Sequence, residues 1–322
     1  MILFPRRLCM GGMLVLLCAG QAFAFGTIVG MGQDAEHERI TRRALACSDT
    51  VPDCFQPASL DELAGGKGNF GAVGIPDRGE LMPANKMHCD GGDWLDVPGY
   101  PRSKEAAQAA LEACRNWMLA KLADAVRDAG KLLGDENNVR QSQILLPCGF
   151  RPEVKGNAKC SVIEDFGILL HASQDFYART NWVDQADPSQ PIGPRNAPGL
   201  AQTGRAAWLD LRADAPFPAG LISGCFESIP EERSCNYGED LLRVKRLFLN
   251  KDLGTIDPDI GKGTTPRGLI ADNFAHAVEA AIDDTRDKWA TLKEQLSATY
   301  GDEPGARMAC ALTHDRSLNN CP

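Results

Sequence analysis

A histidine and an aspartate near the middle of the chain have the spacing of a metal-ligand pair. His171 and Asp175 lie four residues apart in the stretch DFGILLHASQDFYARTNWVD. Hydrophobic spacing predicts a helix over about residues 161–179, so both side chains project from the same side of it, one turn apart. Imidazole and carboxylate groups both bind zinc. A surface ladder of ion pairs is the alternative, because Arg179 continues the four-residue step and could pair with Asp175.

Helical periodicity leaves the surroundings of this pair open. The apolar residues of the same segment gather on one face, and His171 and Asp175 lie on a polar stripe well away from it. In helical bundles, metal sites are built by facing helices that direct such stripes inward. The stripe therefore faces either water or a polar cavity.

A second histidine lies near the start of the chain. A helix is predicted over about residues 35–47, with Asp34 as its N-cap. His37 lies on the apolar side of this helix, at the spacing of Ile40, Thr41 and Ala44. From this helix alone, a hydrogen-bonded core histidine is preferred over a metal ligand.

Further candidate ligands lie in the region 51–100, which is rich in Gly, Pro and Asp. They are Asp77 and the cluster His88, Asp90 and Asp93. A loop region of this length inside a compact domain is usually functional or disordered. Carboxylate and imidazole groups suit zinc, but turn chemistry beside glycine is a strong alternative explanation for any one of the aspartates.

The last long helix, predicted over residues 266–300, repeats the ambiguity of the central one. Its apolar face contains Phe274, Val278, Ile282 and Trp289. His276 and Glu279 lie on the opposite face, with Asp272 and Asp283. This face is either an exposed stripe or the wall of a cavity.

The first 24 residues predict an exported protein. They contain a basic start, an apolar run and the small-residue ending Ala22-Phe23-Ala24, which describe a secretory signal peptide. Cleavage after Ala24 would make Phe25 the mature N-terminus. No other run approaches the length of a membrane span, so we expect a soluble periplasmic or secreted protein.

Cysteine usage agrees with export. Two of the twelve cysteines, Cys9 and Cys18, would leave with the signal peptide, and an even number remains, which is typical of a disulfide framework. Nearest-neighbour pairing would join Cys47–Cys54, Cys89–Cys114, Cys148–Cys160, Cys225–Cys235 and Cys310–Cys321. Cysteine zinc sites are the weaker alternative, because the chain has no CxxC pair.

Segments with helical spacing alternate with irregular ones along the chain. Helices are predicted over residues 35–47, 103–133, 161–179, 237–250 and 266–300, and the region 185–224 is predicted to be an irregular surface excursion. We expect an all-α fold, with a single bundle-like domain over 25–300 that has long irregular loops and is stapled by disulfides. A disulfide-tethered tail would follow over 301–322.

The charge of the chain disfavours one class of partner. The formal charge is −9, and loss of Arg6 and Arg7 with the signal peptide would make it −11. An acidic chain lacks the electrostatic footprint of a nucleic-acid-binding protein, although bound zinc could reverse the sign locally.

The order of these residues resembles a known family. A mature start at Phe25-Gly26, His37 in EHERITRRAL, an Asp and a His in a loop, LLHASQDFYARTNW, and a late helical His276 are similar to bacterial relatives of the fungal Het-C heterokaryon-incompatibility proteins. Those proteins are related to zinc-dependent phospholipases C and fungal single-strand nucleases, an all-α superfamily with a trinuclear zinc site. The match covers most of the mature chain, with the central stretch as its specific part.

The resemblance implies two zinc ions and their ligands. The amino group and carbonyl of Phe25, with His37 and Asp175, would hold one ion. Asp77, His88 and His171 would hold the second, with Asp175 bridging the two.

A third zinc in the family needs residues that this chain has in altered form. Arg179 stands where the Het-C pattern has a histidine, and Ala280 stands four residues after His276, where the family has an acid. His276 and Glu279 still share a helical face, so a distorted third site is the remaining form of this expectation. Arg179 could instead supply a positive charge that holds phosphate through its planar fork.

Three functions follow as hypotheses. The first is an exported zinc phosphodiesterase of the phospholipase C type, which acts on a phosphodiester such as a phospholipid head group, with Asp77 orienting or deprotonating the attacking water. The second is a disulfide-rich interaction protein with a degenerate or structural zinc site, motivated by Arg179 and Ala280. The third is a zinc-dependent single-strand nuclease, against which the acidic charge argues.

Overall fold

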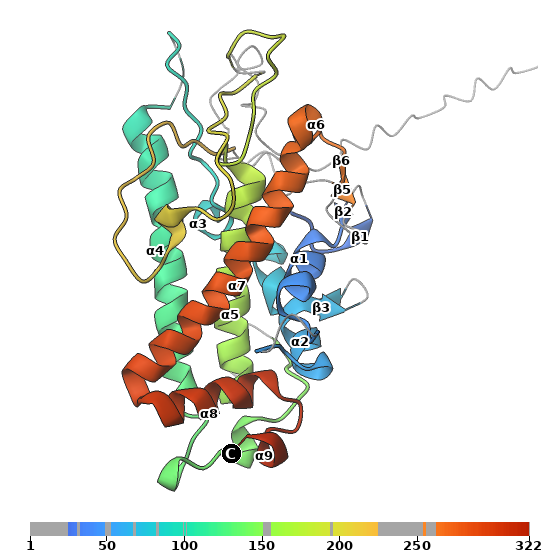
Figure 1. Cartoon of the computed structure of the whole chain (residues 1–322), viewed down its shortest axis with the longest axis vertical. Helices are drawn as coiled ribbons and strands as arrows, with labels where there is room; N and C mark the ends of the chain where they lie inside the picture. The colour runs from blue at the N-terminus through green and yellow to red at the C-terminus, as the bar shows by residue number, and fades with distance from the viewer. Residues whose placement is uncertain are drawn as a thin grey trace, which may run out of the picture.

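Three long helices lie lengthwise beside one another and form the body of the protein (Figure 1). They are α4 (Lys104–Ala129), α5 (Ala158–Arg179) and α7 (Asn273–Tyr300). The computed structural model describes residues 25–30, 33–48, 53–66, 69–81, 84–98, 100, 102–150, 156–193, 196–224, 254–255 and 262–321. The strands in these ranges are two-residue segments in antiparallel pairs, so the expected all-α fold class is confirmed.

Shorter helices pack around the long ones. α1 (Glu36–Leu45) packs on α7, and α2 (Pro57–Ala64) packs on α1 and α5. α3 (Asn85–His88) lies against α4 and α5. α8 (Asp302–Thr313) crosses the end of the bundle, at the bottom of Figure 1, and α9 (Ser317–Asn320) follows it.

The remaining described elements are strand pairs and single turns. The pairs are β1 (Val29–Gly30) with β2 (Gln33–Asp34), β3 (Gly65–Gly66) with β4 (Asn69–Phe70), and β5 (Gly254–Thr255) with β6 (Lys262–Gly263). The turns are α6 (Pro266–Leu269) and the 3₁₀ segments η1 (Ala72–Asp77), η2 (Gly79–Leu81), η3 (Asp135–Asn137), η4 (Gln141–Gln143), η5 (Ala207–Leu209) and η7 (Ile270–Asp272).

α5 is the central helix and is buried along almost its whole length. It packs against α4 on one side and α7 on another. Phe166, Leu169 and Phe176 join the main hydrophobic core. Because neighbours also cover its polar stripe, His171 and Asp175 are fully buried. Of the two alternatives that the sequence leaves open for this stripe, the structure has the buried one.

Four disulfides close short loops and tie helices together. They are Cys47–Cys54, Cys89–Cys114, Cys148–Cys160 and Cys310–Cys321, which confirms four of the nearest-neighbour pairs. The fifth predicted pair, Cys225–Cys235, lies outside the described residues. Such bonds are compatible with an exported protein. Within the described ranges, no helix has the length and apolar character needed to cross a membrane.

Several helix boundaries differ from the predictions. The expected N-cap of α1, Asp34, is wrong: Ala35 occupies that position with φ 51°, and the Asp34 carboxylate instead pairs with Arg39 at 2.8 Å. α5 begins three residues earlier than expected, because the Asn157 side chain accepts a hydrogen bond from the Cys160 amide.

The last predicted helix, over residues 266–300, is interrupted. It is divided into α6, the turn η7 and α7, with Ala271 at φ 44° and Asp272 at φ 57°. Residues with left-handed φ end a regular helix, so a new helix, α7, begins at Asn273. The helix predicted over 237–250 lies outside the described residues.

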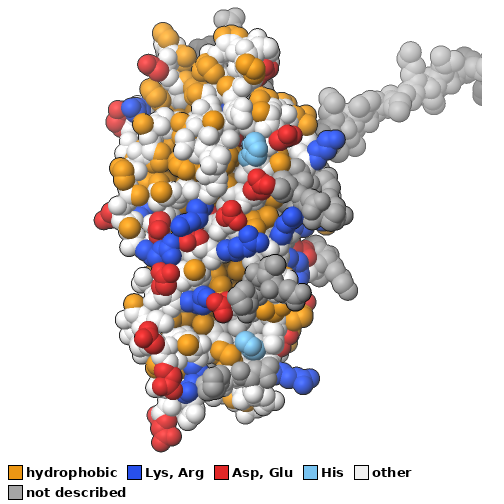
Figure 2. Space-filling view, viewed as in Figure 1, with side chains coloured by type: hydrophobic (Ala, Val, Ile, Leu, Met, Phe, Trp, Pro, Cys, Tyr) orange, Lys and Arg blue, Asp and Glu red, His pale blue; other side chains and the backbone are white. Residues whose placement is uncertain are grey.

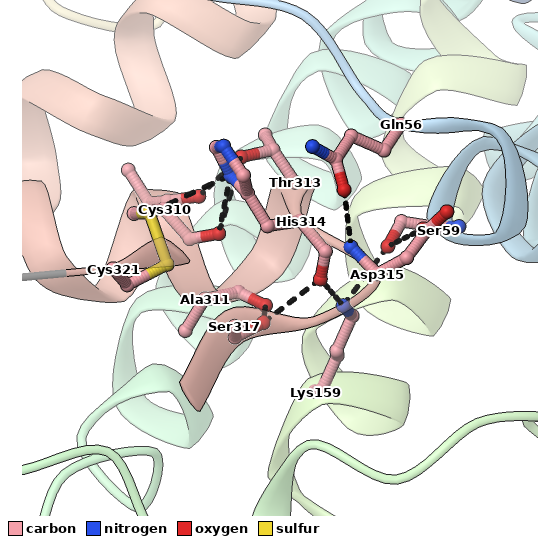
Figure 3. Close-up of a disulfide and its surroundings, with 11 residues drawn as sticks. Gln56, Ser59, Lys159, Cys310, Ala311, Thr313, His314, Asp315, Ser317 and Cys321 are labelled. Carbon is pink, nitrogen blue, oxygen red and sulfur yellow. Dashed lines mark hydrogen bonds between the residues drawn. A yellow bond between two sulfur atoms is a disulfide. The ribbon is translucent and has the colours of Figure 1, made fainter. Parts of the chain in front are cut away.

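The chain beyond α7 is tied to the start of α2 and α5 (Figure 3). The Lys159 ammonium group donates to Ser59 Oγ at 2.9 Å and to the carbonyl of His314 at 2.8 Å. The Asp315 carboxylate accepts from the amides of Ala58 and Ser59, and so caps α2 from a distant part of the sequence. The expected tail is thus a packed part of the fold.

The buried Lys159 should make the free energy of unfolding depend on pH. Burial lowers the pKa of Lys159 to about 8, against the raising effect of Asp315 and Glu62. Between about 8 and its ordinary value of 10.5, this lysine binds fewer protons in the folded than in the unfolded chain. Its contribution to the free energy of unfolding therefore rises with pH across that window.

Chemical denaturation of the wild type and of Lys159→Met at about pH 7 and about pH 10 measures this effect. We expect the difference in unfolding free energy, wild type minus variant, to be larger at the higher pH. An equal difference at the two pH values would contradict the buried, depressed lysine.

Candidate metal centre

Five side chains with metal-binding groups meet beside the middle of α5. His37 comes from α1, Asp77 ends η1, His88 ends α3, and His171 and Asp175 lie one turn apart on α5. The side chains of His37, His171 and Asp175 are completely buried, that of His88 is 4% exposed, and that of Asp77 is 10% exposed. The structure thus brings together five of the residues that the sequence analysis names as ligands.

The carboxylate of Asp175 divides this cluster into two sides. Its Oδ1 lies 3.2 Å from His37 Nε2. Its Oδ2 lies 2.9 Å from His88 Nδ1 and 3.1 Å from His171 Nε2. A carboxylate whose two oxygens face different ligand sets has the arrangement of a bridge between two cations.

Hydrogen bonds outside the cluster fix the orientation of His171. Its Nδ1 lies 2.8 Å from the carbonyl oxygen of Val73, and a carbonyl can only accept. The proton of the neutral ring is therefore on Nδ1, and the lone pair of Nε2 points at Asp175. This is the usual outer contact of a metal-binding histidine.

His37 has the same arrangement on the other side of Asp175. Its Nδ1 lies 2.8 Å from Oε1 of Gln174, which leaves Nε2 directed at Asp175 Oδ1. Among the described residues, neither His37 Nε2 nor Asp175 Oδ1 has a hydrogen-bond partner. Two buried acceptors that face each other at this distance need a proton or a metal cation between them.

The electrostatics of the cluster favour added positive charge. Burial alone would lower the pKa of His171, but the carboxylates of Asp175 and Asp77 outweigh it and raise this pKa to about 9. Burial would raise the pKa of Asp175, but His171 and His37 hold it well below its usual range. A proton on His171 and a metal cation therefore satisfy the same electrostatic demand.

The spacing of these atoms suits a divalent metal ion. The ligand atoms of His37, His171 and Asp175 all lie within 4.8 Å of one another, and so do those of Asp77, His88 and His171. Ligands about 2.0–2.1 Å from a tetrahedral zinc ion stand about 3.4 Å apart. The Asp77 Oδ1 distances of 3.7 Å to His171 Nε2 and 3.9 Å to His88 Nδ1 are slightly longer than this value, and the Asp175 distances slightly shorter.

Phe25 lies next to the cluster, where its aromatic ring packs against two other rings. The ring packs edge-on against His37, with centroids 6.1 Å apart, and against Phe274. The neighbouring backbone is held by hydrogen bonds from the Gly26 amide to Glu36 Oε2 and from the His37 amide to the Gly26 carbonyl. The first described residues thus adjoin the first turn of α1, beside the side of the cluster where the resemblance expects Phe25.

A glycine allows η1, which carries Asp77, to approach α5. A side chain at Gly167 would come within 2.4 Å of Ala72 Cβ and within 2.7 Å of the Val73 amide nitrogen. The missing side chain lets η1 lie directly on α5, one turn before His171. This contact positions both the Val73 carbonyl and Asp77 at the end of η1. Thr27 in turn donates a short hydrogen bond to Asp77 Oδ2.

Arg179 lies one turn beyond Asp175 and forms an ion pair. Its Nε is 3.4 Å from Asp90 Oδ1, and both side chains are 1% exposed. Burial raises the pKa of Asp90 above its ordinary value, although the charges of Arg179 and His88 oppose this rise. The guanidinium is therefore matched to a carboxylate from the same loop as His88, which the sequence analysis does not foresee.

The structure does not bring His276 and Glu279 to the cluster. Both lie on the exposed side of α7, because Ala277 and Val278 turn into the core. They line a surface groove of about 510 Å³ together with Arg43 and Arg286. On this face acidic and basic side chains are interspersed (Figure 2).

A third group of close donors, Cys310, His314 and Cys321, has both sulfur atoms joined in a disulfide, so neither is available as a thiolate.

Sequence reasoning also misses Gln174, the hydrogen-bond partner of His37. Its position between His171 and Asp175 in HASQD is the only signal that could have indicated it.

Comparison with known proteins identifies no relative. No protein-family model matches the chain, and neither the curated proteins nor the solved structures include a significant match.

The cluster predicts metal binding that depends on His171. We expect protein that is incubated with zinc and then desalted to retain the metal, and His171→Asn to lose it, because His171 belongs to both close groups of donors. His276→Asn is the matched control, since it removes a histidine that lies on the exposed face. Elemental analysis measures the zinc content of the wild type and of both variants. Full metal retention by His171→Asn would contradict the assignment.

Proposed function

We propose that this protein is an exported zinc-dependent phosphodiester hydrolase of the phospholipase C type, similar to the Het-C-like proteins. The observation that carries the proposal is the buried cluster in which Asp175 directs one oxygen at His37 and the other at His88 and His171. Nitrogen and oxygen donors at this spacing suit zinc.

The residues divide into two proposed ligand sets. His37 and Asp175 would hold one ion, with the main chain of Phe25 after cleavage at Ala24. Asp77, His88 and His171 would hold the other, because a single Nε2 lone pair on His171 serves one ion. Zinc held in this way lowers the pKa of bound water and neutralises phosphoryl oxygens.

Asp77 is the proposed general base. It is the most exposed member of the cluster, with 10% of its side chain accessible, so it lies nearest to solvent. The hydrogen bond from Thr27 occupies Oδ2, and Oδ1 faces His88 and His171. A carboxylate held in this position can orient an attacking water and accept its proton.

Burial of the cluster favours a second candidate function. Four of its five side chains are at most 4% exposed, and structural zinc sites are closed whereas catalytic ones keep an open position. A disulfide-stapled interaction protein with a structural metal would have these features. The two functions differ in whether the bound metal supports turnover.

Hydrolysis assays distinguish the candidates. We expect zinc-loaded protein to hydrolyse a chromogenic phosphorylcholine ester, to lose activity when a chelator removes the metal, and to regain it when zinc returns. Single-stranded DNA serves as the comparison substrate for the nuclease alternative. A fully metal-loaded protein that hydrolyses neither compound would contradict the enzyme proposal and favour the structural site.

Arg179 offers a sharper test through a conservative change. Arg179→Ala would leave Asp90 as an uncompensated buried charge, which costs about 3–5 kcal/mol, so loss of function would be uninformative. Arg179→Lys keeps the charge and removes the planar fork that suits phosphate. A hydrogen bond to a charged group contributes about 1.5–3 kcal/mol, so we expect turnover to fall at least about 10-fold with metal content unchanged.

Arg267→Lys is the control for this test. Arg267 forms another buried ion pair, with Asp184 at 2.8 Å, and it is not among the residues of the cluster. Unaltered turnover in Arg179→Lys, or loss of metal, would exclude the proposed contact with phosphate.

A further inference from the structure

Gln174 is a buried residue of α5 whose side-chain amide contacts two other helices. It lies on α5 and is completely buried. Its Oε1 is 2.8 Å from His37 Nδ1 on α1. Its Nε2 is 2.9 Å from Thr41 Oγ1, also on α1, and 3.1 Å from Thr285 Oγ1 on α7.

The direction of this amide follows from the hydrogen bond of its neighbour. The Thr285 hydroxyl donates to the carbonyl of Ala281 at 2.7 Å, so towards Gln174 it can only accept. The nitrogen of the amide therefore faces Thr285, and the oxygen faces His37. That oxygen accepts from Nδ1–H of His37, which leaves the Nε2 lone pair aimed at Asp175.

We propose that Gln174 is a positioning residue of the metal centre, which holds His37 in the Nδ1–H tautomer. The inference rests on the proposed metal site and extends it beyond the direct ligands. The packing of α1 and α7 against α5 acts through Thr41 and Thr285 to orient the amide, and the amide orients the ligand. Outer contacts of this kind contribute to metal affinity without touching the metal.

The choice of an amide has a consequence for charge. Asp77 and Asp175 already place two carboxylates in the buried cluster. A glutamate at position 174 would accept the same Nδ1–H proton and strengthen His37 as a ligand, but it would add a third negative charge. A glutamine supplies the acceptor without that charge.

The test compares zinc affinity, measured by competition with a chromogenic chelator, in three variants. Gln174→Leu removes the acceptor at similar volume, and we expect zinc affinity to fall about 10- to 100-fold. Gln174→Glu keeps an acceptor for His37 Nδ1–H, and we expect its zinc affinity to exceed that of Gln174→Leu. Asn196→Leu removes another buried amide, which holds the turn at Asp187, and should leave zinc affinity unchanged.

A second measurement reports on the ring itself. Ring ¹⁵N shifts of histidine distinguish a protonated nitrogen from a metal-bound one. In the zinc-loaded proteins we expect His37 of wild type to carry its proton on Nδ1, and Gln174→Leu to lose this preference. Visible absorption of the cobalt-substituted proteins reports the geometry of the ligands and should differ between wild type and Gln174→Leu. This readout does not depend on activity.

The outcomes separate this inference from the proposed function. If wild type binds no zinc, the metal centre itself is wrong. If wild type binds zinc and Gln174→Leu binds it equally well, with the same cobalt spectrum, the positioning role is excluded while the metal centre stands. If Gln174→Leu does not fold, Thr285→Val, which removes the hydroxyl that orients the amide, must weaken zinc binding or the inference is overturned.

Discussion

The burial of the Asp175 carboxylate is the constraint on which the arrangement of the cluster depends. A charge taken out of water costs several kcal/mol unless partners compensate it, and Asp175 is completely buried. Its partners are imidazole rings delivered by α1, α3 and α5 itself. The arrangement of these helices thus surrounds one carboxylate with nitrogen donors.

That requirement is met by backbone approach as much as by side chains. Gly167 lets η1 lie on α5, so that a main-chain carbonyl of Val73 fixes the ring of His171. The disulfide between Cys89 and Cys114 ties the residue after His88 to α4. A site that must hold several groups within fractions of an ångström needs such rigid supports. Here they come from a close helix contact and a covalent bond.

The sequence predicted the long helices and five of the residues that meet in the cluster, and it failed where burial decides. Periodicity identified the helices because apolar spacing is a local property. Nearest-neighbour pairing of cysteines was correct for the described bridges, since each closes a short loop. The stripe of His171 and Asp175 could not be assigned to water or cavity, because which face a neighbour covers is set by tertiary packing.

Tertiary packing also explains why the prediction and the structure differ for residues of α7 and α5. His276 and Glu279 have the spacing of ligands on α7, yet that face of α7 is exposed. Gln174 has no special spacing, yet it contacts His37 because α1 and α7 both meet α5 at that turn. Residue type and spacing identify candidates, and only the packing of distant segments separates ligands from surface residues.

The net charge of the centre would depend on how many metal ions it binds, and this charge would affect which function the centre can perform. The carboxylates of Asp77, Asp90 and Asp175 carry three negative charges, and Arg179 supplies one positive charge against them. With neutral histidines, one divalent cation would bring the centre to neutrality, which suits a structural site that nothing charged needs to enter. Two divalent cations would leave a net charge of two positive units in a buried environment, where interaction with an anionic phosphodiester is strong. The ion pair with Asp90 balances the net charge of Arg179. Any excess positive charge in the centre would therefore come from bound metal ions, and their number would distinguish a structural site from a catalytic one.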